Sequence, residues 1–209
     1  MVTSQPQNEG DAQRLELSSR HVSFWLRHLR LLPAQYTSAD TQRMTIAFFC
    51  LSALDLLGAL QSKTSDEDRR SYRDWIYRMQ CPGGGFSGSP ASGSASTSTS
   101  TSRGEGDYGH LAMTYTALAN LAILRDDFTR LDRRALRNLL KTCQRSDGSF
   151  SSTPGAQEYD PRFTYCAFAV CSMLGDWTSI DVELALRYLD CCQVSQFPLQ
   201  HSRLVGRAH

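Results

Sequence analysis

An apolar stretch with helical spacing occurs three times in this chain, and it constrains the fold more than any other feature. The clearest copy covers residues 107–124, DYGHLAMTYTALANLAIL, which has almost no charged side chains. A near copy covers 160–174, with Thr114 aligned on Thr164, and a looser copy covers 45–57. A helix of this composition needs apolar cover on nearly every side. The chain is therefore predicted to be a repeat of helical units.

Amphipathic segments that end in glutamine alternate with these apolar stretches. Gln80, Gln144 and Gln193 end three such segments, and Phe86 and Phe150 follow the first two after a glycine-containing turn. We interpret each unit as a hairpin of an amphipathic outer helix and a buried inner helix. Such a hairpin cannot bury its apolar face alone, so the units must stack. Curved stacking places the inner helices around a shared axis.

The pattern predicts an all-α chain with three irregular segments. Residues 1–18 are polar and without periodicity, and we expect them to be disordered. Residues 87–106 form a low-complexity Ser/Thr/Gly-rich loop inserted into a domain that covers 19–193. No glycine turn follows Gln193, so we expect 194–209 to be an aberrant tail and the array to be incomplete at its C-terminus. Helices are predicted at 19–32, 45–60, 67–80, 107–124, 131–144, 161–174 and 179–193.

Composition excludes several classes of protein. A formal net charge of +1 gives no basic surface for nucleic acid. No apolar run reaches the roughly 20 residues that span a bilayer, and the polar N-terminus is not a signal peptide. We therefore expect a cytoplasmic protein without a transmembrane segment. The seven cysteines include no CxxC pair, and Cys50, Cys143, Cys166, Cys171 and Cys192 lie in apolar runs, which favours structural free thiols over a metal or disulfide role.

Three stretches resemble the β subunits of protein prenyltransferases, most closely those of the type I geranylgeranyl branch. They are residues 20–57, 109–124 and 147–170, which include the sequence DGSFSSTPGAQEYDPRFTYCAFAV. The resemblance implies an α–α barrel (toroid) that pairs with a helical α subunit. It also implies a catalytic zinc ion, geranylgeranyl diphosphate as lipid donor, and CaaX-motif proteins such as small GTPases as acceptors.

The resemblance implies two groups of substrate-binding residues. His110, Glu158 and Arg162 match a polar trio that, in the farnesyl relatives, engages the substrate's C-terminal carboxylate through water. Apolar-pocket and lipid-wall positions match Thr45, Ala112, Phe163 and Tyr165, with Arg162 beside the lipid. Farnesyltransferases carry a bulky Trp where this chain has Thr45, so the smaller residue favours a twenty-carbon lipid. Phe49 and Tyr115 are expected to serve core packing first and lipid contact second.

Other interpretations remain open at these positions. Arg162 can equally be a cation at a helix start, paired with Asp160 or Glu158, and a lone His110 is more often a satisfied core histidine. In the family, the zinc ligands are an Asp-x-Cys pair and a distant His on later repeats. No such repeats follow here, and His201 and His209 lack a matching context, so no metal ligand is assigned in this chain.

Three functional hypotheses follow. The first is a subunit of a zinc-dependent geranylgeranyltransferase, with this 209-residue form expected to be inactive on its own. The second is a non-catalytic protein that binds the α subunit or the substrate. The third is a farnesyltransferase β subunit. A squalene-cyclase-like barrel is disfavoured because the chain has no Asp-rich initiator motif.

Overall fold

The computed structural model describes the backbone of residues 9–90 and 107–193, with side chains from residue 18 onward in these ranges. Within these ranges the chain is helical, and its β structure is limited to three isolated bridges. The all-α prediction is therefore confirmed. The elements are α1 Glu9–Arg30, the 3-10 helix η1 Ala34–Gln42, α2 Arg43–Leu56, α3 Leu60–Lys63, α4 Asp66–Arg78, α5 Leu111–Ile123, α6 Arg133–Cys143, α7 Pro161–Leu174 and α8 Val182–Cys192.

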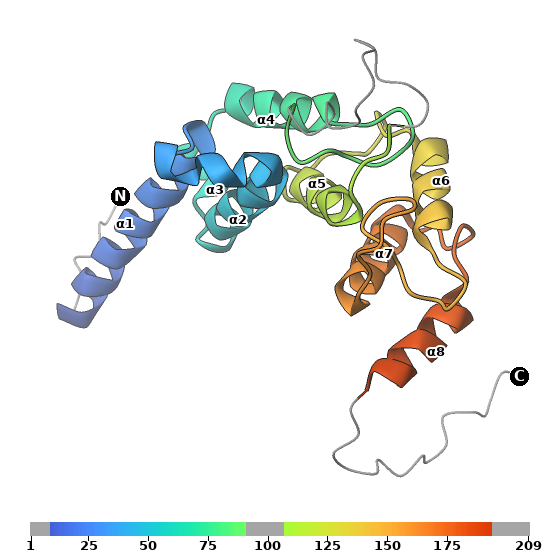
Figure 1. The fold of residues 1–209 in the computed structure, drawn as a ribbon. Helices are drawn as coiled ribbons and strands as arrows, with labels where there is room; N and C mark the ends of the chain where they lie inside the picture. The colour runs from blue at the N-terminus through green and yellow to red at the C-terminus, as the bar shows by residue number, and fades with distance from the viewer. Residues whose placement is uncertain (1–8, 91–106, 194–209) are drawn as a thin grey trace, which may run out of the picture.

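The helices form an arch with an inner and an outer row. The inner row is α2, α5 and α7, in which α2 packs on α5 and α5 on α7. The outer helices α4 and α6 also pack on α5, and α8 packs on α7. The limbs of the arch are α1 at one end and α7 with α8 at the other (Figure 1). The outer helices α4 and α6 are followed along the chain by the inner helices α5 and α7, as the hairpin interpretation predicted.

Several helix bounds differ from the predicted ones. The helix predicted from residue 107 begins at Leu111, and the one predicted from 179 begins at Val182. The helix expected from residue 19 begins at Glu9, so the expectation of disorder was wrong for residues 9–18. Leu, Ala, Gln, Arg and Glu dominate that segment, and their helix propensity needs no periodic apolar pattern. The helix expected over 45–60 ends at Leu56, because Gly58 adopts a left-handed conformation with φ 64° and the Ala59 amide bonds back to the Leu54 carbonyl.

The glycine turns connect each hairpin to its neighbour. Gln80 pairs with Phe86 and Gln144 with Phe150 in isolated bridges, and both phenylalanines are fully buried in the core. Gly84 lies with its backbone against the first turn of α6, where an added Cβ would meet the Ala135 carbonyl oxygen at 2.0 Å. The turn is thus buried against the following outer helix and fixes how two units stack.

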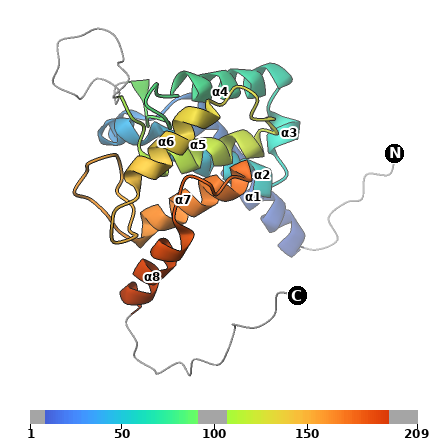
Figure 2. The same ribbon diagram turned by 90° about the vertical axis from the view of Figure 1, so that its right-hand side faces the viewer.

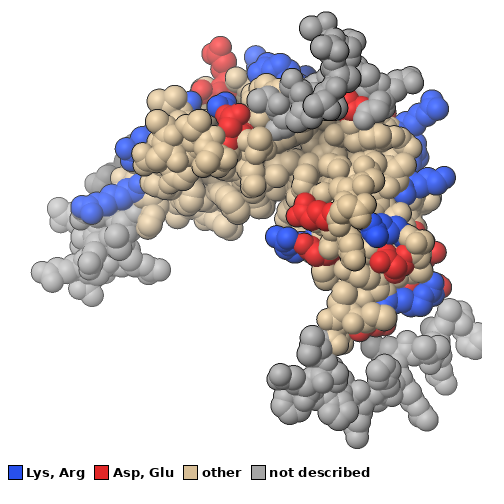
Figure 3. Space-filling view, in the orientation of Figure 1, with Lys and Arg blue, Asp and Glu red and all other residues tan. Residues whose placement is uncertain are grey.

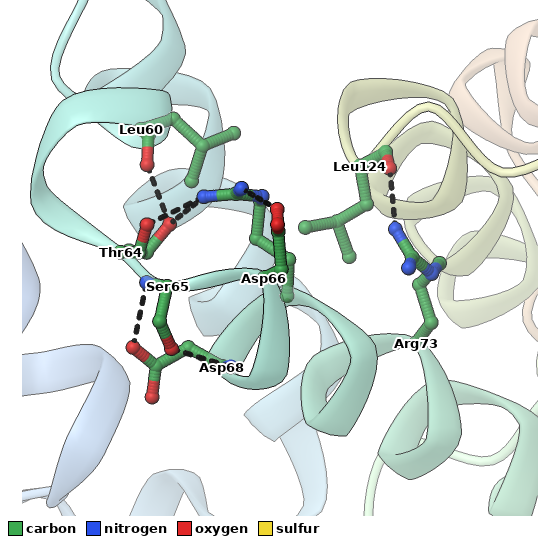
Figure 4. A network of polar contacts seen from close by, with 8 residues as sticks. Leu60, Thr64, Ser65, Asp66, Asp68, Arg73 and Leu124 are labelled. Carbon is green, nitrogen blue, oxygen red and sulfur yellow. Dashed lines mark hydrogen bonds and ion pairs between the residues drawn. The ribbon is translucent and has the colours of Figure 1, made fainter.

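Arginines on the outer helices bind the segment after the next inner helix. Figure 4 shows the start of α4, where Ser65 and Asp68 form a reciprocal capping box, and Arg73 reaching the Leu124 carbonyl. That bond is 2.9 Å long. In the next unit Arg133 donates to the Leu174 carbonyl at 3.2 Å. In both units an arginine of the outer helix thus binds a carbonyl at the end of the next inner helix.

Tyr77 tests this connection between units. Its hydroxyl donates to the Asp126 carboxylate at 2.5 Å, and the Asp126 side chain is nearly buried. We expect Tyr77→Phe to lower the free energy of unfolding by about 1 kcal/mol, because a buried carboxylate loses a donor while the ring remains. Urea unfolding followed by circular dichroism measures this. Tyr36→Phe, at an exposed position, is the control, and equal losses in both variants would contradict the assignment.

Candidate functional site

The inner helices leave one face uncovered on the concave side of the arch. Sequence reasoning predicted that residues 107–124 would be covered nearly all round, but Ala112, Tyr115, Ala119 and Ala122 are not buried. They recur at helical spacing and so form one stripe of α5. In Figure 3 uncharged atoms dominate the view between the limb of α1 and the limb of α7 and α8. Neighbouring helices therefore cover three sides of α5, and its fourth side is open to a ligand.

A row of aromatic side chains crosses this face and joins all three inner helices. From α2, the Phe48 ring lies 5.9 Å from both the Phe49 ring and the Tyr115 ring of α5. The Tyr115 ring in turn lies 5.4 Å from the Tyr165 ring of α7, and their hydroxyls are 3.4 Å apart. Phe49 is 56% exposed and Tyr165 62% exposed. The row is therefore a surface of aromatic rings that apolar ligands can contact directly.

Phe48 is the member of this row that the sequence did not assign to any role. Tyr115 was expected to serve core packing first and lipid contact second, and it is half-buried and joins the two neighbouring helices. Burial, followed by the hydrogen bond to Tyr165, raises the pKa of Tyr115 to about 12, so its hydroxyl stays protonated at neutral pH. The available signal was the spacing of Tyr115 from Ala112 and Ala119, which puts it on the stripe of small residues.

Thr45, Ala112 and Phe163 lie around the start of α5. The Thr45 hydroxyl donates to the Met113 sulfur at 3.3 Å, which ties α2 to α5. Thr45 and Ala112 are half-buried and face the open side with small side chains. Phe163 is buried, and its ring lies edge-on to His110 at 5.7 Å. Phe163 thus packs beneath His110 and does not line the open face.

His110 caps the N-terminus of α5. Its Nδ1 accepts a 3.1 Å hydrogen bond from the Ala112 amide, so the neutral ring carries its proton on Nε2. Burial lowers the pKa of His110, and the negative charge of Glu158 acts in the opposite direction. The imidazole is thus held neutral, with one N–H available as a donor.

Arg162 makes the ion pair that the alternative interpretation predicted. Its guanidinium contacts the Asp160 carboxylate through two nitrogens, with Nη2 at 2.6 Å from Oδ2 and Nε at 3.1 Å from Oδ1. Asp160 also caps α7 by accepting from the Arg162 amide, and these bonds lower the pKa of Asp160. The Arg162 side chain is still 80% exposed and interacts electrostatically with Glu158. Glu158 acts on both His110 and Arg162, so the polar trio lies in one neighbourhood.

Comparison with known proteins identifies the family. Residues 17–200 match the family model described as the prenyltransferase alpha-alpha toroid domain. This chain belongs to that family. The chain is 33% identical over 185 residues to the geranylgeranyl transferase type-1 subunit beta of Arabidopsis thaliana. The aligned region covers 83% of this chain and 48% of the relative. It is 31% identical over 194 residues to the Dictyostelium discoideum subunit of the same name, covering 84% of this chain and 54% of the relative.

A solved structure agrees with the family assignment. The Candida albicans protein geranylgeranyltransferase-I complexed with GGPP superposes with a TM-score of 0.66 at 25% identity, covering 83% of this chain and 50% of that one. The chain thus spans about half the length of the relatives it matches. The arch of inner and outer helices is an arc of an α–α toroid, and the aromatic row lies on its inner side.

The described residues do not fit the zinc ion that the prenyltransferase family implies. Among the described side chains, in residues 18–90 and 107–193, no three His, Cys, Asp or Glu gather as a metal site. Burial raises the pKa of Cys50 to about 11 and of Cys143 to about 12, so these thiols stay protonated. Cys192, expected in an apolar setting, is exposed instead because α8 buries only Ala185. His201 and His209 lie outside the described residues.

None of the described helices combines the length and the apolar character needed to cross a bilayer.

His110 gives a pH-dependent test of the site. In the unfolded chain a histidine gains a proton below about pH 6.5, whereas burial resists protonation in the fold. The unfolded state then binds more protons, so stability falls as pH decreases from about 7 to 5. We expect His110→Asn, which retains a capping side chain, to flatten this dependence in urea unfolding at pH 5, 6 and 7. His21→Asn, at an exposed position, is the control, and an unchanged slope in His110→Asn would contradict the assignment.

Proposed function

We propose that this chain forms part of the β subunit of a type I protein geranylgeranyltransferase, and that its concave face binds the lipid and the C-terminal segment of the protein acceptor. The observation that carries the proposal is the aromatic row from Phe49 to Tyr165 across three helices. Relatives of the type I geranylgeranyl branch match most of the chain, and one of them is solved with GGPP. The partners proposed are a prenyltransferase α subunit, CaaX-motif proteins and geranylgeranyl diphosphate, in the cytoplasm.

The aromatic row suits an isoprenoid chain. Burial of apolar surface contributes about 25 cal/mol per Å², and rings that already line a concave face lose little freedom when a lipid covers them. Thr45 leaves space at the start of α2, where the farnesyl relatives of the resemblance carry Trp. Its hydroxyl is already bonded to Met113, so no unpaired donor faces the lipid. This favours the longer lipid donor.

The polar trio suits the carboxylate at the end of a protein acceptor. His110 offers an Nε2–H from a neutral ring, and Arg162 offers an exposed guanidinium. Arg162 is already paired with Asp160, which favours contact with the acceptor through bridging water over a direct bidentate pair. Glu158 faces both groups and can accept from such water. These roles are binding and orientation. The described residues include no group of side chains that could coordinate zinc, so the polar trio takes part in binding and not in a catalytic step.

The test uses the full chain co-expressed with a prenyltransferase α subunit. We expect the two to purify together and to bind a fluorescent analogue of geranylgeranyl diphosphate more tightly than the farnesyl analogue. Tyr165→Ala should weaken lipid binding about tenfold, because the exposed ring loses its contact area. Leu186→Ala, at an exposed apolar position on outer helix α8, should leave lipid binding unchanged.

The rival functions give different outcomes. Tighter binding of the farnesyl analogue would move the chain to the farnesyltransferase branch. Co-purification with the α subunit without any lipid binding would favour a non-catalytic interaction protein. Transfer of geranylgeranyl to a CaaX peptide by the 209-residue chain and its partner would overturn the expectation that this form is inactive.

A further inference from the structure

A cavity lies beside α2, and none of the residues that line it belongs to the aromatic row. It has a volume of about 320 Å³ and is enclosed by the end of α1, the first half of α2 and the second half of α4. Its α2 residues include Arg43, Ala47 and Leu51, which follow one another at helical spacing. Phe49 points about half a turn away from them. The cavity therefore shares no residue with the candidate site, and it stands independently of the proposed function.

The charged side chains that line this cavity are all basic. Arg30, Arg43 and Arg78 contribute guanidinium groups from three different helices, and no Asp or Glu is among the lining residues. Arg43 pairs with Asp40 at 2.5 Å. Within the described ranges, neither Arg30 nor Arg78 has a carboxylate at ion-pair distance. Like charges brought together by separate elements repel each other unless an anion lies between them.

The floor of the cavity is apolar and aromatic. Leu51 and Ile76 are fully buried there, and Trp75 and Tyr72 are half-buried against the core. Burial is the main cause of the raised pKa of Tyr72, while the neighbouring Arg30 lowers it, so the phenol remains a neutral donor. A volume of this size is at the lower end of small-molecule pockets. The cavity thus joins a cationic rim to a small apolar floor.

We propose that this cavity between α1, α2 and α4 binds a phosphate monoester that carries a short apolar tail. Guanidinium groups match the oxygens of a phosphate in paired hydrogen bonds. Arg78 and Arg30 supply them, and Arg30 also hydrogen-bonds the Tyr72 hydroxyl in the same cavity. The floor around Trp75 and Ile76 receives the tail. A free amphiphilic phosphate and the headgroup of an anionic lipid share this chemistry.

The experiment measures binding of hexyl phosphate to the full 209-residue chain by isothermal titration calorimetry. Hexanol supplies the tail without the charge, and inorganic phosphate supplies the charge without the tail. We expect saturable binding of hexyl phosphate, with both partial probes at least tenfold weaker. Arg78→Gln and Arg30→Gln should each weaken hexyl phosphate about tenfold. Arg70→Gln, an exposed arginine of α4 that does not line the cavity, is the matched control and should bind as the parent does.

The outcomes separate this site from the concave face. Tyr165→Ala should leave hexyl phosphate binding unchanged, because it alters only the aromatic row. The absence of saturable binding would overturn the proposal. So would binding that is unchanged in Arg30→Gln and Arg78→Gln, or binding that is lost in Tyr165→Ala. Vesicles containing phosphatidic acid identify the source. Vesicle binding that is lost with Arg78→Gln assigns the site to a lipid headgroup, and binding of hexyl phosphate alone assigns it to a free ligand.

Discussion

Replacing Gly84 with alanine is expected to lower the free energy of unfolding by about 3–5 kcal/mol. Two effects add at this position. The backbone has φ 115°, a conformation that side chains of L residues rarely adopt. In addition, the new Cβ would meet the Ala135 carbonyl oxygen at 2.0 Å and its carbon at 2.6 Å. Neither atom can move without shifting the first turn of α6.

Gly58→Ala separates these two effects. Gly58 has φ 64°, and a Cβ added there has no heavy atom within 4 Å. Gly58→Ala therefore places a side chain in a left-handed conformation without any collision. We expect it to lower the free energy of unfolding by about 1 kcal/mol. Urea unfolding of the two variants under the same conditions gives the comparison. If Gly84→Ala lost no more than Gly58→Ala, the turn would not be packed on α6 as described.

Gly148 extends the argument to the next unit. It has φ 90°, and an added Cβ would meet the Leu184 carbonyl oxygen on α8 at 2.2 Å. Each glycine thus lies in the turn after one outer helix and against the backbone of the following outer helix. A collision there disrupts the contact between units, so Gly148→Ala is expected to match Gly84→Ala in size. The spacing between stacked hairpins therefore depends on residues without side chains.

Sequence periodicity predicted the elements of this fold well. Predicted bounds for 161–174 coincide with α7, because Asp160 caps it, Pro161 suits its first turn and Gly175 ends it in a left-handed conformation. In the first helix, Val22, Trp25, Leu26 and Leu29 recur at helical spacing and pack on the core, as an amphipathic helix requires. These features are local, and local preference is what sequence patterns report.

The open face of the inner helices was not predictable in the same way. Composition does not distinguish a helix that is buried on all sides from one with a single open side, because Ala and Tyr occur in both. The row formed by Phe48, Tyr115 and Tyr165 comes from three helices. The repeat aligns Tyr115 with Tyr165, but spacing along the chain does not show that the three rings lie side by side. For Arg162 the sequence left Asp160 and Glu158 open as partners, and the cap at the start of α7 brings Arg162 and Asp160 together.

Phe150→Ala is the second substitution for which we expect a large effect, about 3–5 kcal/mol of unfolding free energy. The Phe150 ring has no exposed surface and lies in the main core cluster. Its backbone is held by the bridge to Gln144 and by neighbouring turn bonds, so the surroundings cannot collapse into the cavity. The decrease in unfolding free energy then includes both the lost burial of the ring and the cost of an unfilled cavity.

Phe49→Ala removes the same ring from the concave face and gives the comparison that links stability to function. Because this ring is 56% exposed, we expect its removal to cost under about 1 kcal/mol of unfolding free energy. If the concave face binds lipid, Phe49→Ala weakens lipid binding while the protein stays folded, whereas Phe150→Ala lowers the melting temperature first. Unfolding and lipid titration of both variants measure the two effects. A Phe49→Ala variant that lost stability but kept lipid binding would assign this ring to the core, and the aromatic row would then be a packing surface between helices.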